Sequence, residues 1–248
     1  MPLPRYKTAS RTTTAGVLLL LPVIVHLVIW NLWMHDRLAA LIITAATLGY
    51  IWYFRSTKML IVALSVGALG TLQDTYFITH GIWRYSSMHG AIIPLYVPAL
   101  WAAIGCIVIG LFKFIAHITR AHPLLSYHRP RPAHHQLVAT VLALTAALAA
   151  LATLADTIPL LALTFLAIDI AYVTFMRSVP LALVGATVFL FGMIGEITAV
   201  SFGAWAYANG TFHGVPPFIF FGWDVIGTVI VGTYMTLDAF FLHRTHQR

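Results

Sequence analysis

The sequence predicts an all-α integral membrane protein of eight transmembrane helices, arranged as two tandem parallel four-helix repeats. Of its 248 residues, 60% are hydrophobic and 8% are charged, whereas soluble domains carry about 25% charged residues. In addition, one pattern of residues occurs twice at a constant spacing of 122 positions. The matched pairs are Gly70/Gly192, Asp74/Glu196, Gly81/Gly203, Trp83/Trp205, Tyr85/Tyr207, Pro94/Pro216, Trp101/Trp223 and Gly105/Gly227. A spacing held without gaps over this length indicates a duplicated unit.

Eight apolar runs have the length of a membrane span, for which about 17–25 residues are needed. In chain order they are residues 15–34, 38–54, 59–80, 92–116, 137–155, 158–176, 180–202 and 215–242. The first run has the basic flank of a signal peptide, but it has a counterpart at 137–155, so we predict a spanning helix. Four helices in each copy give both copies the same orientation, which is a parallel duplication.

The charges along the chain predict its orientation. Twelve of the fourteen Lys and Arg residues fall on one side of the predicted topology, and only Arg37 and Arg84 fall on the other. The positive-inside rule therefore predicts a multi-pass protein of the cell membrane with both termini in the cytoplasm. The first repeat covers residues 1–116 and the second covers 137–248. A cytoplasmic linker rich in proline, histidine and arginine, residues 117–136, joins them.

Four acidic residues lie within apolar runs: Asp74, Asp169, Glu196 and Asp224. A carboxylate near the bilayer centre costs about 2.5–3.5 kcal/mol on insertion scales, so such groups face the bundle interior and usually serve function. Asp74 and Glu196 occupy matched positions, at the same predicted depth in the outer half of the membrane. The alternative is that these acids hydrogen-bond their neighbours and only stabilise the bundle.

Asp169 and Asp224 break the symmetry, because the first copy has Thr47 and Ala102 at the matched positions. Depth arithmetic at about 1.5 Å per residue places Asp224 in the outer half of the membrane and Asp169 near its middle. We therefore predict Asp224 as a third catalytic carboxyl beside Asp74 and Glu196, and Asp169 as a substrate-binding residue.

Each acid is followed by a Gly-x-Trp-x-Tyr motif and then by a deeper tryptophan. Aromatic residues at this level are typical of the interfacial belt, but Trp101 and Trp223 lie too deep for a belt. A lining of aromatic faces suits a hydrophobic substrate and stabilises a carbocation. The predicted lining residues are Trp83, Tyr85, Trp101, Trp205, Tyr207 and Trp223.

Several other kinds of site are not predicted. The single cysteine, Cys106, excludes a multi-cysteine metal site. The twelve histidines do not form the paired clusters of membrane di-iron enzymes, and the chain has no phosphate loop or dinucleotide fingerprint. We therefore predict no metal and no cofactor. The net charge of +7 is explained by topology, so no nucleic acid partner is predicted.

The segment from Asp74 to Tyr85, with Asp-x-Tyr followed by Gly-x-Trp-x-Tyr, resembles the integral-membrane lycopene cyclase domain. The chain is also similar to membrane meroterpenoid cyclases in its length and in its one acid per half. The second copy resembles carotenoid hydratase-type membrane proteins. In lycopene cyclases a Glu-Glu doublet follows the proline, whereas here Pro94 precedes Leu95-Tyr96. The resemblance therefore implies the acid and aromatic arrangement at Asp74 and Glu196, without a metal.

Together these features predict a membrane-embedded terpenoid or isoprenoid cyclase or isomerase acting on a hydrophobic isoprenoid-type substrate. Asp74 or Glu196 would protonate a double bond or epoxide. The other acid, with Asp224, would orient it or take the final proton. Three alternatives stay open: a carotenoid hydratase-like enzyme, a proton- or cation-coupled transporter, and a non-catalytic assembly or lipid-binding protein.

Overall fold

The chain is a bundle of helices. A computed structural model describes residues 11–86, 92–120, 132–154 and 157–246. In this part of the chain the eight helices are α1 (Arg11–Leu32), α2 (Asp36–Phe54), α3 (Thr57–Thr79), α4 (Tyr96–Arg120), α5 (Ala133–Leu154), α6 (Ile158–Met176), α7 (Val179–Ser201) and α8 (Pro217–His246). Seven helices are long and apolar enough to cross a membrane, whereas the apolar part of α1, Gly16–Leu32, is shorter. The all-helical fold and the multi-pass membrane prediction are thus confirmed, and in the described part of the chain seven of the eight helices qualify as spans by length and composition.

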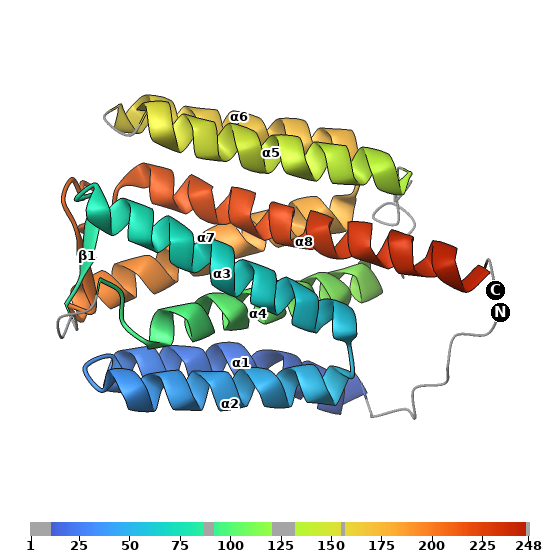
Figure 1. The fold of residues 1–248 in the computed structure, drawn as a ribbon, viewed down its shortest axis with the longest axis horizontal. Helices are drawn as coiled ribbons and strands as arrows, with labels where there is room; N and C mark the ends of the chain where they lie inside the picture. Colours follow the sequence, from blue (N-terminus) through green and yellow to red (C-terminus); the bar gives the residue numbers. More distant parts are fainter. Residues whose placement is uncertain (1–10, 87–91, 121–131, 155–156, 247–248) are drawn as a thin grey trace.

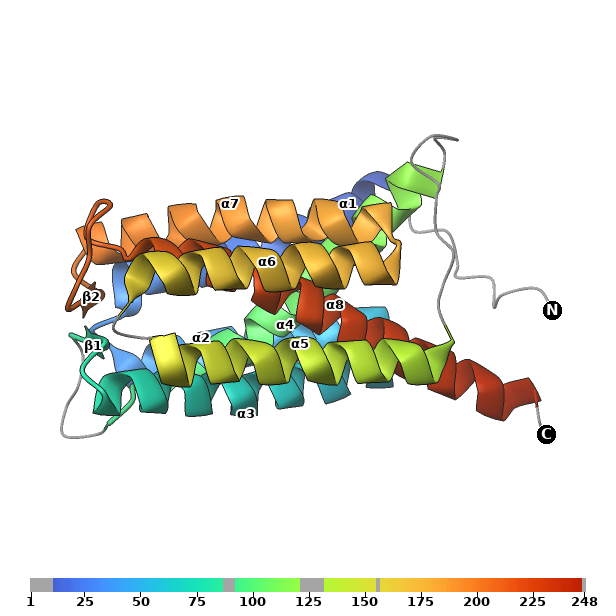
Figure 2. The ribbon, with the colours of Figure 1, turned by 90° about the horizontal axis from the view of Figure 1, so that it is seen from above.

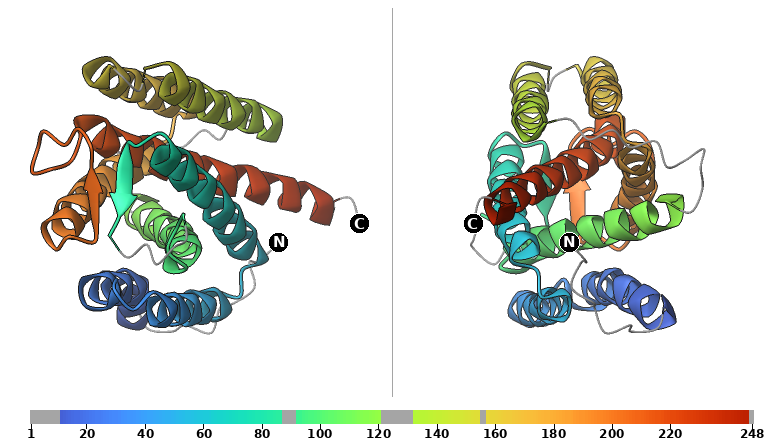
Figure 3. Two further views of the ribbon diagram at one scale, coloured as in Figure 1. Left: turned by 60° about the vertical axis from the view of Figure 1, so that its left-hand side comes forward. Right: turned by 90° about the vertical axis from the view of Figure 1, so that its right-hand side faces the viewer.

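The helices form three layers (Figure 1). The central layer contains α3, α4, α7 and α8, in which α3 packs on α4 and α7 packs on α8. The pair α1–α2 covers one side of this layer and the pair α5–α6 covers the other, as the end-on view in Figure 3 shows. The apolar core therefore runs through the central layer, and any site between α3, α4, α7 and α8 is shielded on two sides.

The corner between α2 and α3 is built like the corner between α6 and α7. Arg55 and Arg177 adopt the left-handed conformation, with φ of 44° and 50°. Ser56 and Ser178 then cap the next helix, because each hydroxyl accepts a hydrogen bond from the backbone N–H three residues on, at 3.3 Å. As a result α2 and α3 begin and end 122 residues before α6 and α7, at 36 and 158, 54 and 176, 57 and 179, 79 and 201.

Two three-residue strands connect the halves of the chain. Strand β1 (Trp83–Tyr85) pairs antiparallel with β2 (Trp205–Tyr207), so that Trp83 lies opposite Tyr207 and Tyr85 opposite Trp205. Figure 2 shows both strands at one end of the bundle, which we call the strand end. A glycine precedes each strand with φ of +68° at Gly81 and +74° at Gly203, where any larger residue is strained. These strands were not predicted from the sequence.

The helices on either side of the predicted linker extend into it. Helix α4 continues to Arg120 and α5 begins at Ala133, so both ends of the predicted linker, 117–136, are helical. The central part of that linker, residues 121–131, lies outside the described residues. The remaining predicted helix boundaries agree with the observed ones to within a few residues.

Candidate functional site

The first cluster of polar groups in the central layer surrounds Asp74 on α3. Asp74 is only 1% exposed. Its Oδ2 atom accepts hydrogen bonds from the Tyr85 hydroxyl at 2.5 Å and from Nε1 of Trp101 at 3.0 Å. Its Oδ1 atom is buried and has no hydrogen-bond partner among the described residues. Two donors therefore hold one oxygen of this carboxyl group and leave the other oxygen available. We call Asp74, Trp83, Tyr85 and Trp101 the Asp74 cluster.

The second cluster surrounds Glu196 on α7 and has one more hydrogen bond. Oε2 accepts from the Tyr207 hydroxyl at 2.6 Å and from Nε1 of Trp205 at 2.9 Å. Oε1 accepts from Nε1 of Trp223 at 3.0 Å. Three donors thus engage both oxygens, an arrangement that stabilises a negative charge on the carboxyl group. We call Glu196, Trp205, Tyr207 and Trp223 the Glu196 cluster.

A glycine makes room for the tryptophan from the neighbouring helix in each cluster. Gly70 lies four residues before Asp74, on the same face of α3. A Cβ atom at Gly70 would overlap the Trp101 ring, and a Cβ atom at Gly192 would overlap the Trp223 ring. The small residue therefore allows each indole to cross the helix and reach the carboxyl group one turn further on.

The tyrosine donors lie on β1 and β2, outside the membrane-spanning helices. Burial raises the pKa of Tyr85 well above its ordinary value, and the nearby Asp74 carboxyl group raises it further. Burial raises the pKa of Tyr207 in the same way, with a contribution from Glu196. Both phenols therefore keep their protons at neutral and moderately alkaline pH and act only as donors to the acids.

The two clusters meet in one cavity of about 40 Å³ near the strand end. A water molecule needs at least about 10–15 Å³, so this space fits very few small groups. At its wall the Trp101 and Trp223 rings stack, with centroids 5.6 Å apart and an interplanar angle of 20°. The lining residues are Asp74, Trp83, Tyr85, Leu100, Trp101, Ile104, Glu196, Trp205, Tyr207 and Trp223.

The structure thus brings eight of the ten predicted site residues to one place. Leu100 and Ile104 were missed, although Ile104 lies three residues after Trp101 on the same face of α4 and Leu100 lies four residues before Ile104. That spacing could have identified them.

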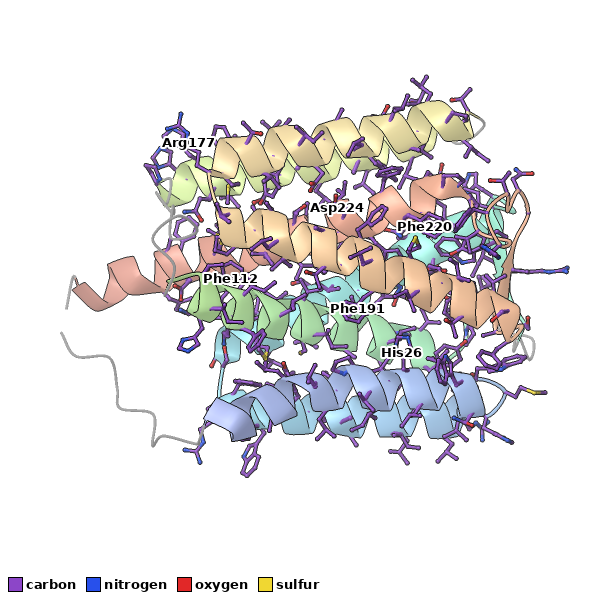
Figure 4. The ribbon with its side chains drawn as sticks, turned by 180° about the vertical axis from the view of Figure 1, so that it is seen from behind. His26, Phe112, Arg177, Phe191, Phe220 and Asp224 are labelled. Atoms are coloured by element: carbon purple, nitrogen blue, oxygen red, sulfur yellow. The ribbon has the colours of Figure 1, made fainter. Side chains whose placement is uncertain are left out.

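Asp169 and Asp224 are not among the residues that line this cavity. They lie together elsewhere in the bundle: the hydroxyl of Thr228, one turn after Asp224 on α8, donates to Oδ1 of Asp169 at 2.7 Å, and Oδ1 of Asp224 is buried without a hydrogen-bond partner among the described residues. Figure 4 shows Asp224 partway along the bundle interior. A Cβ atom at Gly185 would overlap Asp224, so the glycine on α7 accommodates it. Two neighbouring carboxyl groups repel each other when both are ionised, so this arrangement favours a proton on one of them.

A second, larger cavity of about 240 Å³ opens at the strand end. It is lined by Tyr76, His80, Gly81, Ile82, Ala152, Ile158, Asn209, Pro216 and Phe218. The ring centroid of the buried Phe77 lies 4.5 Å from that of Trp83 and 6.5 Å from that of Phe218. Trp83 lines the acid cavity, and Phe218 lines the larger cavity. Phe77 therefore contacts a wall of each cavity.

Within the described ranges, no three His, Cys, Asp or Glu side chains gather closely enough to hold a metal ion. Comparison of the chain with protein-family models, with curated proteins and with solved structures finds no match. A functional assignment therefore depends on the geometry of the site itself.

Proposed function

We propose that the protein is a membrane-embedded acid–base enzyme, an isoprenoid cyclase or isomerase that works without a redox cofactor. We also propose that it consists of two tandem parallel four-helix units with both termini in the cytoplasm. One observation carries the functional proposal: two carboxyl groups from matched positions share one aromatic-lined cavity among membrane-spanning helices, and they are held by different numbers of donors.

The different hydrogen bonding assigns the two acids different roles. Asp74 has an unengaged oxygen and two donors on the other one, so the neutral acid with its proton on Oδ1 suits this environment. Glu196 accepts three hydrogen bonds across both oxygens, so the carboxylate suits its environment. Two negative charges in one apolar cavity repel each other, which further favours one acid and one carboxylate. We therefore assign Asp74 as the proton donor and Glu196 as the base.

In the proposed reaction, Asp74 gives one proton to the substrate and Glu196 takes one proton from it. The O–H bond of Asp74 breaks while the π electrons of a substrate double bond form a new C–H bond, which leaves a carbocation. A second double bond attacks that cation and closes a ring, or the cation remains in place. Glu196 then removes a proton from an adjacent carbon, and the electrons of that C–H bond form a new double bond. Return of the proton from Glu196 to Asp74 through the cavity restores the enzyme.

The surrounding residues suit a cationic intermediate and an apolar substrate. The faces of Trp101 and Trp223 attract a positive charge and are 5.6 Å apart at the cavity wall. The 40 Å³ cavity has room for the reacting carbons alone. We propose that the rest of the chain occupies the 240 Å³ cavity and that it passes Phe77, whose ring lies between residues of both walls.

Deuterium incorporation tests this proposal. Purified protein in nanodiscs would be incubated in D₂O with a panel of linear isoprenoids of ten to forty carbons, and the products would be analysed by mass spectrometry. A cyclase or isomerase yields a product that carries one solvent deuteron on carbon, and D74N yields none. A wild-type protein that incorporates no deuterium into any panel member would contradict the proposal.

A proton-coupled transporter is the second candidate, and the Asp169–Asp224 pair favours it. Neighbouring carboxyl groups in membrane-spanning helices are a feature of proton relays, and the matched residues of the first half, Thr47 and Ala102, have no carboxyl group. Proteoliposomes that contain a pH-sensitive dye separate the two candidates. A transporter acidifies the lumen in response to an imposed gradient and loses this flux in D224N, whereas the proposed enzyme shows no flux.

A further inference from the structure

The Asp74 cluster contains a donor and an acceptor without a protein partner, and the Glu196 cluster does not. Nε1 of Trp83 has no hydrogen-bond partner among the described residues, although the side chain is only 9% exposed. Oδ1 of Asp74 is in the same situation in a side chain that is 1% exposed. Both residues line the same small cavity. Leaving a buried polar atom unpaired destabilises a protein, so two such atoms in one cavity wall require an explanation.

The length of the acid side chain provides that explanation. Trp205 follows Glu196 by nine residues and donates to it at 2.9 Å. Trp83 follows Asp74 by the same nine residues and occupies the matched position on the paired strand. Aspartate is shorter than glutamate by one methylene group, so its carboxyl group reaches Trp101 and Tyr85 but does not engage the Trp83 indole. The difference between the clusters therefore follows from one CH₂ group.

We infer that Asp74 and Trp83 form a subsite for one neutral oxygen atom of a ligand. This oxygen accepts the Nε1–H of Trp83 and pairs with Oδ1 of Asp74. It has two sources: a water molecule, or the hydroxyl, carbonyl or epoxide oxygen of an isoprenoid substrate. The second source depends on the proposed function, whereas the first does not.

The chemistry of the two residues selects neutral oxygen over other groups. The indole N–H is a donor only, so it gains nothing from an ammonium group and requires a lone pair. An anion is disfavoured because two carboxyl groups already share the cavity. A neutral oxygen offers lone pairs to both Trp83 and a protonated Asp74, and it fits the 40 Å³ space.

A crystal structure in a lipidic phase, at a resolution that shows water, tests the subsite directly. The inference predicts one oxygen within hydrogen-bonding distance of both Trp83 Nε1 and Asp74 Oδ1, and no matching oxygen at Trp205. In D74E the longer side chain takes the bond from Trp83 and the oxygen is lost. In the matched control E196D, a second oxygen appears beside Trp205. Wild-type density with no atom at the subsite would overturn the inference for water.

A pair of ten-carbon probes separates the two sources. Geraniol carries a terminal hydroxyl group, and 2,6-dimethylocta-2,6-diene lacks it. If a substrate oxygen binds, geraniol raises the Tm of the wild-type protein by about 2 °C or more and the hydrocarbon does not. W83F abolishes the geraniol effect, and the matched control W205F retains it. Ordered water without a geraniol effect supports water as the ligand. The absence of both ordered water and a geraniol effect would overturn the inference.

Failure of this subsite and failure of the proposed function are distinguishable. Deuterium transfer to a hydrocarbon substrate requires Asp74 as an acid but not an oxygen ligand. Deuterium incorporation without density or a geraniol effect therefore contradicts the subsite alone. Ordered oxygen at Trp83 without any deuterium incorporation contradicts the enzyme proposal alone.

Discussion

The Asp74 and Glu196 clusters occupy matched places in the bundle, yet they differ in their hydrogen bonds. Both have a tyrosine donor from a strand, at 2.5 and 2.6 Å, and a tryptophan donor from a helix, at 3.0 Å. Only Glu196 has a third donor, Trp205. A nearly symmetric scaffold thus gives two carboxyl groups different numbers of hydrogen-bond donors when one side chain is shorter by a single methylene group.

The largest expected effect comes from removing the acid without changing its shape. D74N keeps acceptor capacity for Tyr85 and Trp101 but cannot transfer a proton, so conversion should fall by at least about a hundredfold, the usual contribution of a general acid. E196Q should also lower conversion, while some solvent deuterium still enters the substrate. Product analysis in D₂O measures both. Equal deuterium incorporation by wild type and D74N would show that the assigned donor is wrong.

A smaller effect is expected on stability from exchanging the acid lengths. E196D shortens the side chain with three donors and replaces the hydrogen bond from Trp205 by one to an ordered oxygen, whose immobilisation should lower the free energy of unfolding by up to about 2 kcal/mol. D74E gives Trp83 a partner and should cause no such loss. Thermal melting of both variants in one detergent checks this. A greater loss in D74E than in E196D would contradict the structural comparison.

The glycines that make room for the indoles should behave alike in both clusters. G70A and G192A each place a Cβ atom inside a tryptophan ring, and such overpacking costs about 1–3 kcal/mol. Thermal melts should show similar losses in the two variants. Gly49, whose Cβ position has no neighbour within 4 Å, provides the control substitution G49A. If G70A and G49A have the same melting temperature, the Trp101 ring does not pack against Gly70.

The Asp169–Asp224 pair is expected to have a moderate effect on conversion, because neither residue lines the acid cavity. D224N removes one of the two neighbouring carboxyl groups and leaves the wall of the acid cavity unchanged, so conversion should fall by no more than about tenfold, or 1.4 kcal/mol in activation free energy. The double variant D169T/D224A installs the residues of the first half. Loss of conversion as complete as that of D74N would place the pair in the proton path.

The smallest effect concerns the phenols at high pH. Burial raises the pKa of Tyr85 in the folded protein, whereas an unfolded tyrosine titrates near about 10. Below this pH both states hold the proton and the full stability is present. Above it the unfolded state releases the proton first, so stability falls as pH rises. Y85F should show a shallower fall of Tm above pH 10 than wild type, and equal slopes would contradict the burial of this phenol.

Much of the fold could be predicted from the sequence, because apolar runs and a constant repeat spacing can be recognised without knowing which residues are in contact. Helix α6 was predicted at 158–176 and is observed there. The strands could not be predicted, since three residues are too few for a recognisable period of two. Their pairing determines where Trp83 and Trp205 lie.

The candidate site was predictable in its members but not in its internal geometry. Depth arithmetic grouped Asp224 with Asp74 and Glu196, because residue counts from the helix starts predict similar heights. In the structure, however, Asp224 packs against Gly185, eleven residues before Glu196 on α7. Depth does not specify which helix face a residue occupies, and packing of α6 against α8 joins Asp224 to Asp169. The number of hydrogen-bond donors on each acid depends on how far each side chain extends, and the spacing of residues along the sequence does not give that distance.

The central claim is that Asp74 is the neutral acid and Glu196 the carboxylate. Infrared difference spectroscopy of the carboxyl C=O stretch tests it most directly, without any substrate. In wild type minus variant spectra at neutral pH, bands from Asp169 and Asp224 cancel. The account predicts that D74N loses a protonated-carboxyl band that shifts in D₂O, and that E196Q retains it. Loss of that band in E196Q and its retention in D74N would contradict the account.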